Sequence, residues 1–398
     1  MYLINNTKKG LKKTAEYYSE EMRLIMADAG AVLLFIVAMI IYPVVYSIGY
    51  SGEVVKDLPV AVVDLNHSNL SRQYSRMLDA TEQIHVICKP GSLKEAENLF
   101  YEGNIKGIVL IPEDFEKNIL QGIQSNVTVY CDASYFLIYK QIYAGAAYST
   151  GTLSAGVEIK KLLAQGRDLN QALDQRDPLK TNVISLYNPS AGYGSFIMPG
   201  VLLIILQQTL LIGIGLLGAT TREKIKNRNL IVEPLTHGGS ITAVLGKSLA
   251  YLVIYMFNVL FIMVVIPKWF SFPDKSGFLT TLLLTIPYIL SISFLGITIS
   301  VLFKKRAHAL LFMVFLSNVI LFFSGLSWPS AALPPLLYKI AHIFPSTLMI
   351  PAYLRVRIMG APLSSVAYEY TFILVQMVVY FVLACVAYKF SSKKLARE

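Results

Sequence analysis

Long apolar runs separated by short polar segments dominate the chain. Six runs are long enough to cross a bilayer, since about 20 apolar residues span its hydrocarbon core. They cover residues 29–50, 196–219, 243–266, 278–303, 307–326 and 370–388. Lys247 is the only Lys, Arg, Asp or Glu inside them, and we expect its ammonium to snorkel to the interface. The pattern predicts an α-helical membrane protein with six transmembrane helices.

Residues 1–28 precede the first run and are mostly polar. Leu11, Ala15, Tyr18, Met22 and Ile25 recur at steps of three and four, so they share one helix face. This spacing predicts a cytoplasmic amphipathic helix lying in the membrane interface. A flexible polar tail is the alternative. The following run is long enough to span and no small-residue cleavage site follows it, so we expect an anchor, not a cleaved signal peptide.

Residues 51–195 form the one large polar segment. Strand-like stretches at 59–64, 83–88, 105–111 and 127–132 alternate with helical stretches at 68–80, 92–102, 114–121 and 134–166. Ser68 and Ser92 occupy helix N-cap positions, with Glu95 three residues after Ser92 as in a capping box. The alternation predicts an inserted α/β extracytoplasmic (periplasmic) domain. Cys88 and Cys131 both lie in it and could pair in an oxidising compartment, although no spacing rule requires this.

Residues 327–369 combine apolar side chains with closely spaced prolines. Trp328-Pro329, Pro334-Pro335, Pro345 and Pro351 prevent one continuous helix. The segment is too apolar for an ordinary loop. We therefore expect a re-entrant segment of short broken helices packed against protein in the outer leaflet. A surface loop with an interfacial aromatic belt is the alternative.

The composition agrees with a membrane protein, and the charges set its orientation. Hydrophobic residues make up 55% of the 398 residues and charged residues only 15%, with a net charge of +10. The basic excess lies in the termini and in short loops on one predicted side of the membrane. Its members are Lys8, Lys9, Lys12, Lys13, Arg23, Arg222, Lys224, Lys226, Arg228, Lys304, Lys305, Arg306, Lys389, Lys393, Lys394 and Arg397. By the positive-inside rule both termini are cytoplasmic, and the basic residues face anionic membrane lipid and not nucleic acid.

Catalytic motifs are missing from the sequence. Gly246-Lys247-Ser248 resembles the end of a phosphate-binding loop, but Ile241 occupies the position where that loop needs glycine. The five histidines have no metal-ligand spacing, and no nucleophile elbow is present. We expect no catalytic residue, no metal site and no cofactor bound by this chain.

Polar side chains within the six runs are sparse. The amides among them are Gln207, Gln208, Asn258, Asn318 and Gln376. Each could contact substrate, although interhelical hydrogen bonding is the commoner role. No acid lies in a span, which argues against a proton- or sodium-coupled transporter and places the energy source elsewhere. With no polar stripe, the expected substrate is hydrophobic or amphipathic.

The loop 220–242 joins the second and third runs. It is basic at its start and then carries an apolar stretch, which marks a protein contact on a short loop. The candidate contact residues are Arg222, Glu223, Leu230, Ile231, Val232, Glu233 and Pro234. A linker that is basic only because it is cytoplasmic is the alternative, but that leaves the apolar stretch unexplained.

The order of these features resembles an ABC-2 type exporter permease, in the subset with a large periplasmic domain between the first two spans. The resemblance covers the whole chain. It rests on YPVVYSIGY from Tyr42 with DLPVAVVDLN, SLYNPSAGYGSFIMPGVL, TREKIKNRNLIVEPLT and FSGLSWPSAALPPLLYKIAHIFPST. The motif TREKIKNRNLIVEPLT falls where the family has its coupling helix, here residues 222–236. Glu223 matches an acidic residue that is common in the family. Asn227-Arg228-Asn229 departs from the family's usual Gly-Thr.

The resemblance implies that ATP and Mg are bound by a separate P-loop ATPase subunit, and that the permease forms a homodimer or a heterodimer with a sister permease. It also implies a location in the cell inner membrane, export of a drug, lipid or glycolipid, and contact with a periplasmic adaptor protein and outer-membrane channel. A membrane-anchored receptor or scaffold is the competing function. It would explain the outer domain, but not six spans with a proline-rich segment.

Overall fold

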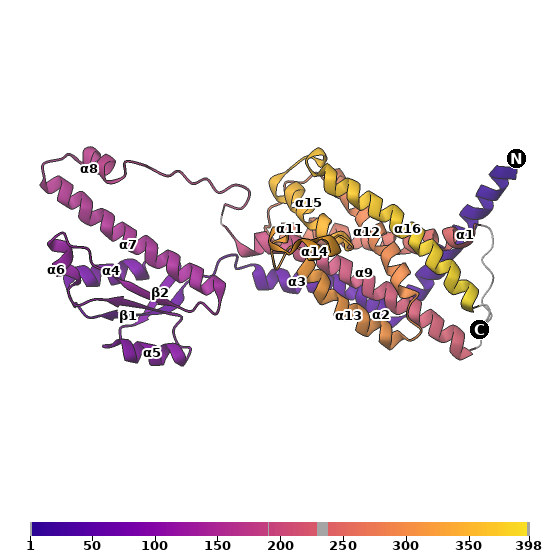
Figure 1. The fold of residues 1–398 in the computed structure, drawn as a ribbon, viewed down its shortest axis with the longest axis horizontal. Coiled ribbons are helices and arrows are strands. Elements are labelled where there is room, and N and C mark those ends of the chain that lie inside the picture. Colours follow the sequence, from indigo (N-terminus) through magenta and orange to yellow (C-terminus); the bar gives the residue numbers. More distant parts are fainter. Residues whose placement is uncertain (1, 190, 229–237, 396–398) are drawn as a thin grey trace. The chain divides into compact units, whose positions relative to one another are not determined.

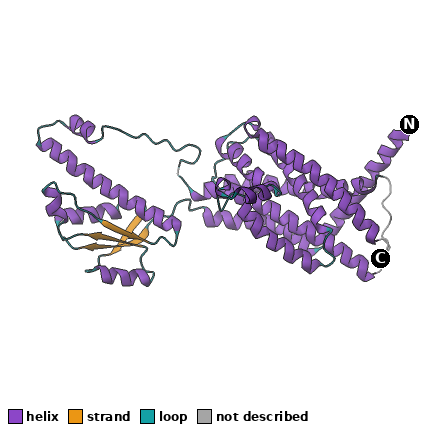
Figure 2. Ribbon diagram, viewed as in Figure 1, coloured by secondary structure: helices purple, strands orange, loops and turns teal. Residues whose placement is uncertain are grey.

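A computed structural model describes residues 2–189, 191–228 and 238–395. The chain divides into two compact units. The helical unit combines Met1–Glu53 with Ser185–Glu398, and the insert unit is Val54–Ile184. Helices are the main element of the first unit, and a small sheet lies in the second (Figure 2).

The helical unit contains six helices that are long and apolar enough to span a membrane, as the sequence predicts. The first comprises α2 (Ala29–Val32), η1 (Leu33–Val37) and α3 (Ala38–Tyr50). It is followed by α9 (Tyr193–Arg228), and then by α10 (Gly239–Leu260) with η2 (Phe261–Val265) and α11 (Ile266–Phe270). The others are α12 (Phe278–Ser300), α13 (Arg306–Phe323) and α16 (Ala367–Leu395), the last preceded by η4 (Leu363–Val366). The start of α1 (Tyr2–Ala27) and the end of α16 lie at the same end of this unit (Figure 1).

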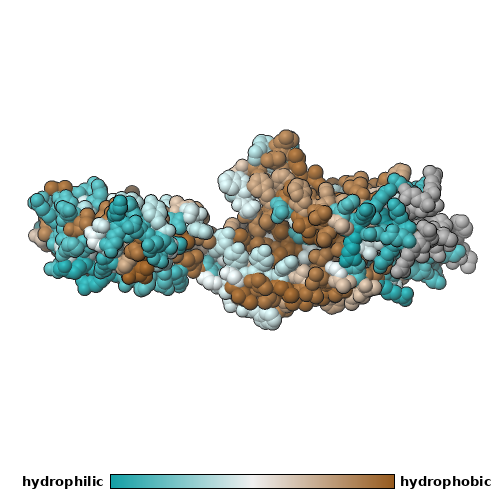
Figure 3. Space-filling model, turned by 90° about the horizontal axis from the view of Figure 1, so that it is seen from below, coloured by the Kyte–Doolittle hydropathy of each residue, from teal (hydrophilic) through white to brown (hydrophobic). Residues whose placement is uncertain are grey.

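Helix α9 is the centre of the helical unit. In the most apolar stretch of α9, 78% of the residues are buried inside the chain, whereas the corresponding share for α13 is 22%. It packs against α3, α12, α13 and α15. Close approach to the first span depends on Gly213, where a Cβ would lie 2.1 Å from the Phe35 ring. Figure 3 shows hydrophobic surface over the middle of the helical unit and hydrophilic surface toward one end.

The proline-rich segment is a series of short helices, as its prolines predict. They are η3 (Ser330–Ala332), α14 (Pro335–Ala341) and α15 (Pro345–Met359). Pro335 and Pro345 each occupy the first turn of a helix, where the missing N–H costs nothing. Most side chains of α15 are buried in the core shared with α9, α12 and α16, so this part of the segment is packed against protein, whereas in α14 only Ala341 is buried.

The insert unit is a four-stranded sheet with helices on both faces (Figure 1). The strand order is β2 (Ile84–Cys88), β1 (Leu58–Asp64), β3 (Gly107–Ile111) and β4 (Thr128–Cys131), with only β4 antiparallel. The helices α4 (Asn69–Asp79), α6 (Phe115–Leu120) and α7 (Phe136–Ala164) contribute to the core on one face. The opposite face packs against α5 (Leu93–Tyr101), and α8 (Leu169–Arg176) packs on α7. Ser68 and Ser92 cap α4 and α5 as predicted.

A disulfide between Cys88 and Cys131 does not fit this sheet. The two residues end β2 and β4, which are the opposite edges, and both thiols are free. Three inter-strand spacings of about 4.8 Å separate these edges by roughly 14 Å. A disulfide needs Cα atoms within about 7 Å.

We therefore expect both thiols to remain free after air oxidation. Alkylation of the unfolded protein without reductant should add three labels, one for each cysteine including Cys385. Burial raises the pKa of the Cys131 thiol, so its labelling in the folded protein should be slower than after unfolding. Intact mass spectrometry measures both results. An oxidised protein that takes up only one label would contradict the strand order.

Candidate functional site

The structure describes the start of the predicted contact loop. Leu230, Ile231, Val232, Glu233 and Pro234 lie outside the described residues. Arg222 and Glu223 belong to the last turns of α9, which continues as one helix from the buried core to Arg228. The candidate site is therefore the end of the helical unit that carries α1 (Tyr2–Ala27) and the ends of α9 and α16.

Arg222 joins α9 to the end of α12. Its Nη1 donates to the carbonyl oxygens of Gly218 (2.7 Å) and Ser300 (2.9 Å), and its Nη2 lies 3.4 Å from Ser300 Oγ. Ser300 is the last residue of α12. A cation at this position satisfies a terminal carbonyl and complements the negative end of the helix dipole.

Glu223 joins α9 to α13 and, through it, to the first span. Its Oε2 accepts from the backbone N–H of Arg306 at 3.0 Å, at the first residue of α13, where the helix dipole favours an anion. The Arg306 guanidinium donates to both carboxylate oxygens of Asp28 at 2.6 and 3.0 Å. Asp28 in turn caps α2 by accepting from the N–H groups of Gly30 and Ala31.

The Asp28 carboxylate is ionised at neutral pH. Burial by itself would raise its pKa, but the hydrogen bonds from Arg306, Ala31 and Gly30 lower it below the ordinary value. The Arg306–Asp28 ion pair is therefore formed at neutral pH. Together with the hydrogen bond from the Arg306 backbone N–H to Glu223, it ties three helices together.

Helix α1 is held against α10 by a largely buried ion pair. Lys247 and the Tyr251 hydroxyl both donate to the Glu21 carboxylate, whose residue is 3% exposed. Lys247 thus has a carboxylate partner within the helical unit that the sequence did not predict. That its ammonium reaches the membrane interface stays a prediction. Gly246 allows the close approach, since a Cβ there would lie 2.5 Å from the carbonyl oxygen of Thr14.

The predicted apolar face of α1 lies partly against the chain itself, and its contact with the membrane interface stays a prediction. Ile25 is fully buried, and Tyr18 and Met22 pack against the core, but Leu11 is 71% exposed. The buried face instead includes Glu21, because its partner on α10 compensates the charge.

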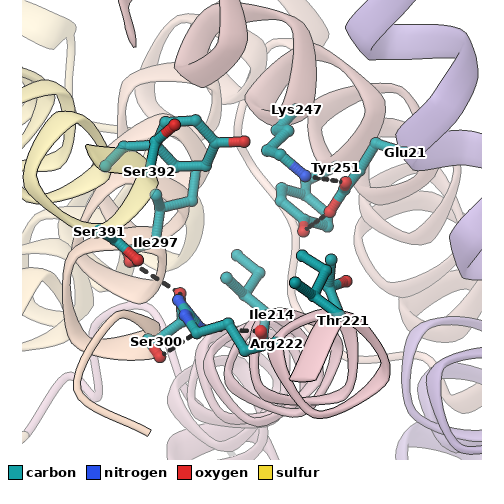
Figure 4. A pocket seen from close by; sticks show the side chains of 13 residues that line it. Glu21, Ile214, Thr221, Arg222, Lys247, Tyr251, Ile297, Ser300, Ser391 and Ser392 are labelled. Atoms are coloured by element: carbon teal, nitrogen blue, oxygen red, sulfur yellow. Dashed lines mark hydrogen bonds and ion pairs between the residues drawn. The ribbon is translucent and has the colours of Figure 1, made fainter. Parts of the chain in front are cut away.

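A cavity of about 110 Å³ lies between these helix ends (Figure 4). Its polar lining includes Glu21, Arg222, Lys247, Tyr251 and Tyr388. Hydroxyl groups of Thr221, Ser300, Ser391 and Ser392 and the apolar side chains of Ile214, Ile225 and Ile297 complete most of the wall. It lies where α1, α9, α10, α12 and α16 converge.

The family model described as "ABC-2 family transporter protein" matches residues 30–386. The chain belongs to the ABC-2 transporter family. It is a multi-pass membrane protein and the membrane subunit of an ABC transport system, a class that generally lacks an ATPase site of its own and pairs with an ATP-binding subunit. No curated protein matches the sequence.

The amides of this ABC-2 permease mostly join its helices. Gln207 and Ser346 exchange two hydrogen bonds, at 2.9 and 3.0 Å, and Gln208 does the same with Ser317 at 2.8 and 3.1 Å. Gln376 donates to the carbonyl oxygen of His342. Asn318 differs, because it is exposed on α13.

Two side chains, Asn258 and Arg357, donate hydrogen bonds to carbonyl oxygens in π-helical turns. The sequence does not single out Arg357. Such π-helical turns are frequent at functional sites and break the regular backbone ladder. Asn258 donates at 2.8 Å to the carbonyl oxygen of Phe35 in η1. Arg357, on α15 and 2% exposed, donates at 3.1 Å to the carbonyl oxygen of Met263 in η2 and at 3.1 Å to Asp274 Oδ2.

The insert unit of the permease has a larger groove of about 840 Å³. It lies between α6, the 121–127 loop and the second half of α7. Phe115, Ile119, Val127, Leu153 and Val157 supply apolar walls, and the lining also includes Glu158 and Lys161. Its mixed lining is suited to an amphipathic ligand or a protein segment.

Proposed function

We propose that this chain is the export permease of an ABC system, moving a hydrophobic or amphipathic compound such as a drug, lipid or glycolipid out of the cytoplasm or inner leaflet. The continuity of α9 carries the proposal. One helix runs from the most buried part of the unit to the start of the loop 220–242. A force applied to that loop by a separate ATPase subunit would reach the core without an intervening hinge.

The contacts at the end of α9 supply a route for that force. Residues 222–236 act as the coupling segment, with Leu230, Ile231, Val232, Glu233 and Pro234 against the ATPase. Displacement of α9 then moves Arg306 through Glu223, and α13 and α2 follow through Asp28. ATP and Mg stay on the partner subunit.

A second permease copy, identical or a sister chain, completes the transporter in this proposal. The surface of α13 supports a contact with a second copy, since only 22% of the residues in its apolar stretch are buried within the chain. The exposed side chains Leu311, Phe315 and Asn318 lie along this helix. Of the five amides we assign the substrate path to Asn318, because Gln207, Gln208, Asn258 and Gln376 are already hydrogen-bonded between helices.

From the basic loops we infer that both termini are cytoplasmic and that the permease lies in the cell inner membrane. The insert unit then lies on the periplasmic side. Its groove beside α7 would be the surface for a periplasmic adaptor protein leading to an outer-membrane channel.

Replacing Glu223 by alanine tests the coupling route. We expect the permease-dependent part of the ATP turnover to fall by about tenfold or more, since a hydrogen bond to a charged group contributes about 1.5–3 kcal/mol and about 1.4 kcal/mol corresponds to tenfold. Turnover is measured in nanodiscs, relative to the ATPase subunit alone. Gel filtration checks that the ATPase subunit remains bound to the variant permease.

Lys224→Ala is the matched control, because Lys224 is exposed one residue further along the same helix. It should leave turnover unchanged. Equal turnover in the wild type and in Glu223→Ala, with the ATPase bound in both, would refute this route.

A further inference from the structure

Arg222 is a largely buried cation without an anionic partner among the described residues. Its guanidinium contacts the carbonyl oxygens of Gly218 and Ser300 and the Ser300 hydroxyl. The ion pairs that the structure describes at this end join other residues, Lys247 to Glu21 and Arg306 to Asp28. Taking a charge out of water without a counter-charge is costly, so a guanidinium that has only neutral hydrogen-bond partners beside a cavity is a position where an anion is stabilised.

The cavity beside Arg222 has the chemistry of an oxyanion site. Its ionisable lining is Arg222, Lys247 and Glu21, with tyrosines besides, and therefore has one net positive charge. Ser391 and Ser392 of α16 line the cavity (Figure 4). With Tyr388, also on α16, they add three hydroxyl groups to the wall. Arginine and hydroxyl groups together are suited to a phosphate, whose oxygens accept several hydrogen bonds at once.

The position of the cavity narrows the source of such a group. Arg222 and Lys247 lie toward the ends of their apolar spans, and Ser391 and Ser392 lie three and four residues beyond the end of the run 370–388. Ile214, Ile225 and Ile297 form an apolar part of the wall. Basic pockets between transmembrane helices at the membrane surface bind anionic lipid headgroups. A volume of about 110 Å³ accommodates a phosphate group and excludes a whole lipid.

We propose that this cavity binds the phosphate of an anionic ligand, with Arg222 as the principal charged contact. A phospholipid headgroup and a free phosphate compound share this chemistry. Since Arg222 holds α9 to α12, a bound phosphate would add contacts to α16 and stabilise this end of the unit. Phosphate binding at this cavity does not depend on transport. It can therefore be measured on the isolated full-length chain, without ATPase or transported substrate.

The test is thermal stabilisation of the purified full-length chain in a neutral detergent. Three probes are titrated: dioctanoyl phosphatidylglycerol, dioctanoyl phosphatidylcholine and sodium phosphate. We expect saturable stabilisation by phosphatidylglycerol and little by phosphatidylcholine, whose choline cation offsets the phosphate charge. If sodium phosphate stabilises saturably and competes with the lipid, the site takes free phosphate as well. Stabilisation by neither anion would overturn the proposal.

Arg222→Gln should weaken binding of the stabilising anion by at least about tenfold, the order expected for losing one hydrogen-bonded charge. Lys226→Gln is the control, since it removes the same charge from an exposed position on the same helix. Equal weakening by both variants, or no weakening by Arg222→Gln, would overturn the site.

A second variant covers the case in which Arg222→Gln does not fold. Ser392→Phe fills the cavity from the end of α16 and leaves both cations in place. It should abolish the stabilisation by phosphatidylglycerol. A folded Ser392→Phe protein that is stabilised as strongly as the wild type would refute binding in this cavity.

Discussion

Replacing Glu21 by leucine is expected to lower the free energy of unfolding by about 3–5 kcal/mol, because it leaves a buried ammonium without its carboxylate. The side chain of Lys247 is 18% exposed and that of Glu21 3%. The Tyr251 hydroxyl loses its acceptor as well. Unfolding in a mixed-micelle denaturant titration, followed by helical circular dichroism, measures the change. Detachment of α1 should also expose this helix to early proteolysis.

Two further variants separate the charge from the packing. Glu20→Leu makes the same substitution at the neighbouring exposed residue and should change stability by less than about 1 kcal/mol. Glu21→Leu with Lys247→Met removes both charges and should regain most of the loss. A double variant as unstable as Glu21→Leu would show that the ion pair is not the cause.

Arg357→Met is expected to have an effect of similar size, about 3–5 kcal/mol. The substitution retains an apolar chain but removes the guanidinium donors to the Met263 carbonyl, Asp274 Oδ2 and the Tyr353 hydroxyl. The carbonyl oxygen of Met263 then has no side-chain donor at a π-helical turn, and α15 loses its connection to the third span. The same denaturant titration measures it.

Arg355→Met is the matched control on the same helix. Its guanidinium pairs with Glu369, but its side chain is 34% exposed, and exposed pairs contribute about 0–1 kcal/mol. Arg357→Lys should lower the free energy of unfolding by an intermediate amount. An ammonium lacks the planar, forked set of donors with which the guanidinium reaches all three acceptors. If Arg355→Met destabilised as strongly as Arg357→Met, the π-turn contact would not be the reason.

Features set by local sequence could be predicted. The six spans follow from apolar length alone, and the broken helices of 327–369 follow from proline geometry. The strands and helices of the insert unit follow from alternation and capping, as Ser68 and Ser92 illustrate. The observed boundaries of the elements differ from the predicted ones by a few residues. The largest difference is at α9, which extends past the apolar run 196–219 to Arg228, because its last turns are made of polar residues that apolar length does not detect.

Pairings between distant residues could not be predicted in the same way. Glu21 and Lys247 are 226 residues apart, Asp28 and Arg306 278, and Asp274 and Arg357 83. Each depends on which helix faces which, and periodicity does not contain that information. One signal was present: Lys247 is the only charge in an apolar run, and a buried lysine requires a carboxylate partner. The roles of Leu230–Pro234 remain predictions, since these residues lie outside the described structure.

The most direct test of the coupling proposal is affinity purification of the tagged chain from native membranes in a mild detergent, with quantitative mass spectrometry of what co-purifies. The account predicts a soluble P-loop ATPase in a one-to-one ratio with the permease. It further predicts loss of that ATPase when Leu230, Ile231 and Val232 are replaced by serine, but not when Lys224 and Lys226 are. An intact, abundant chain that retains no ATPase, or retains it equally in both variants, would contradict the account.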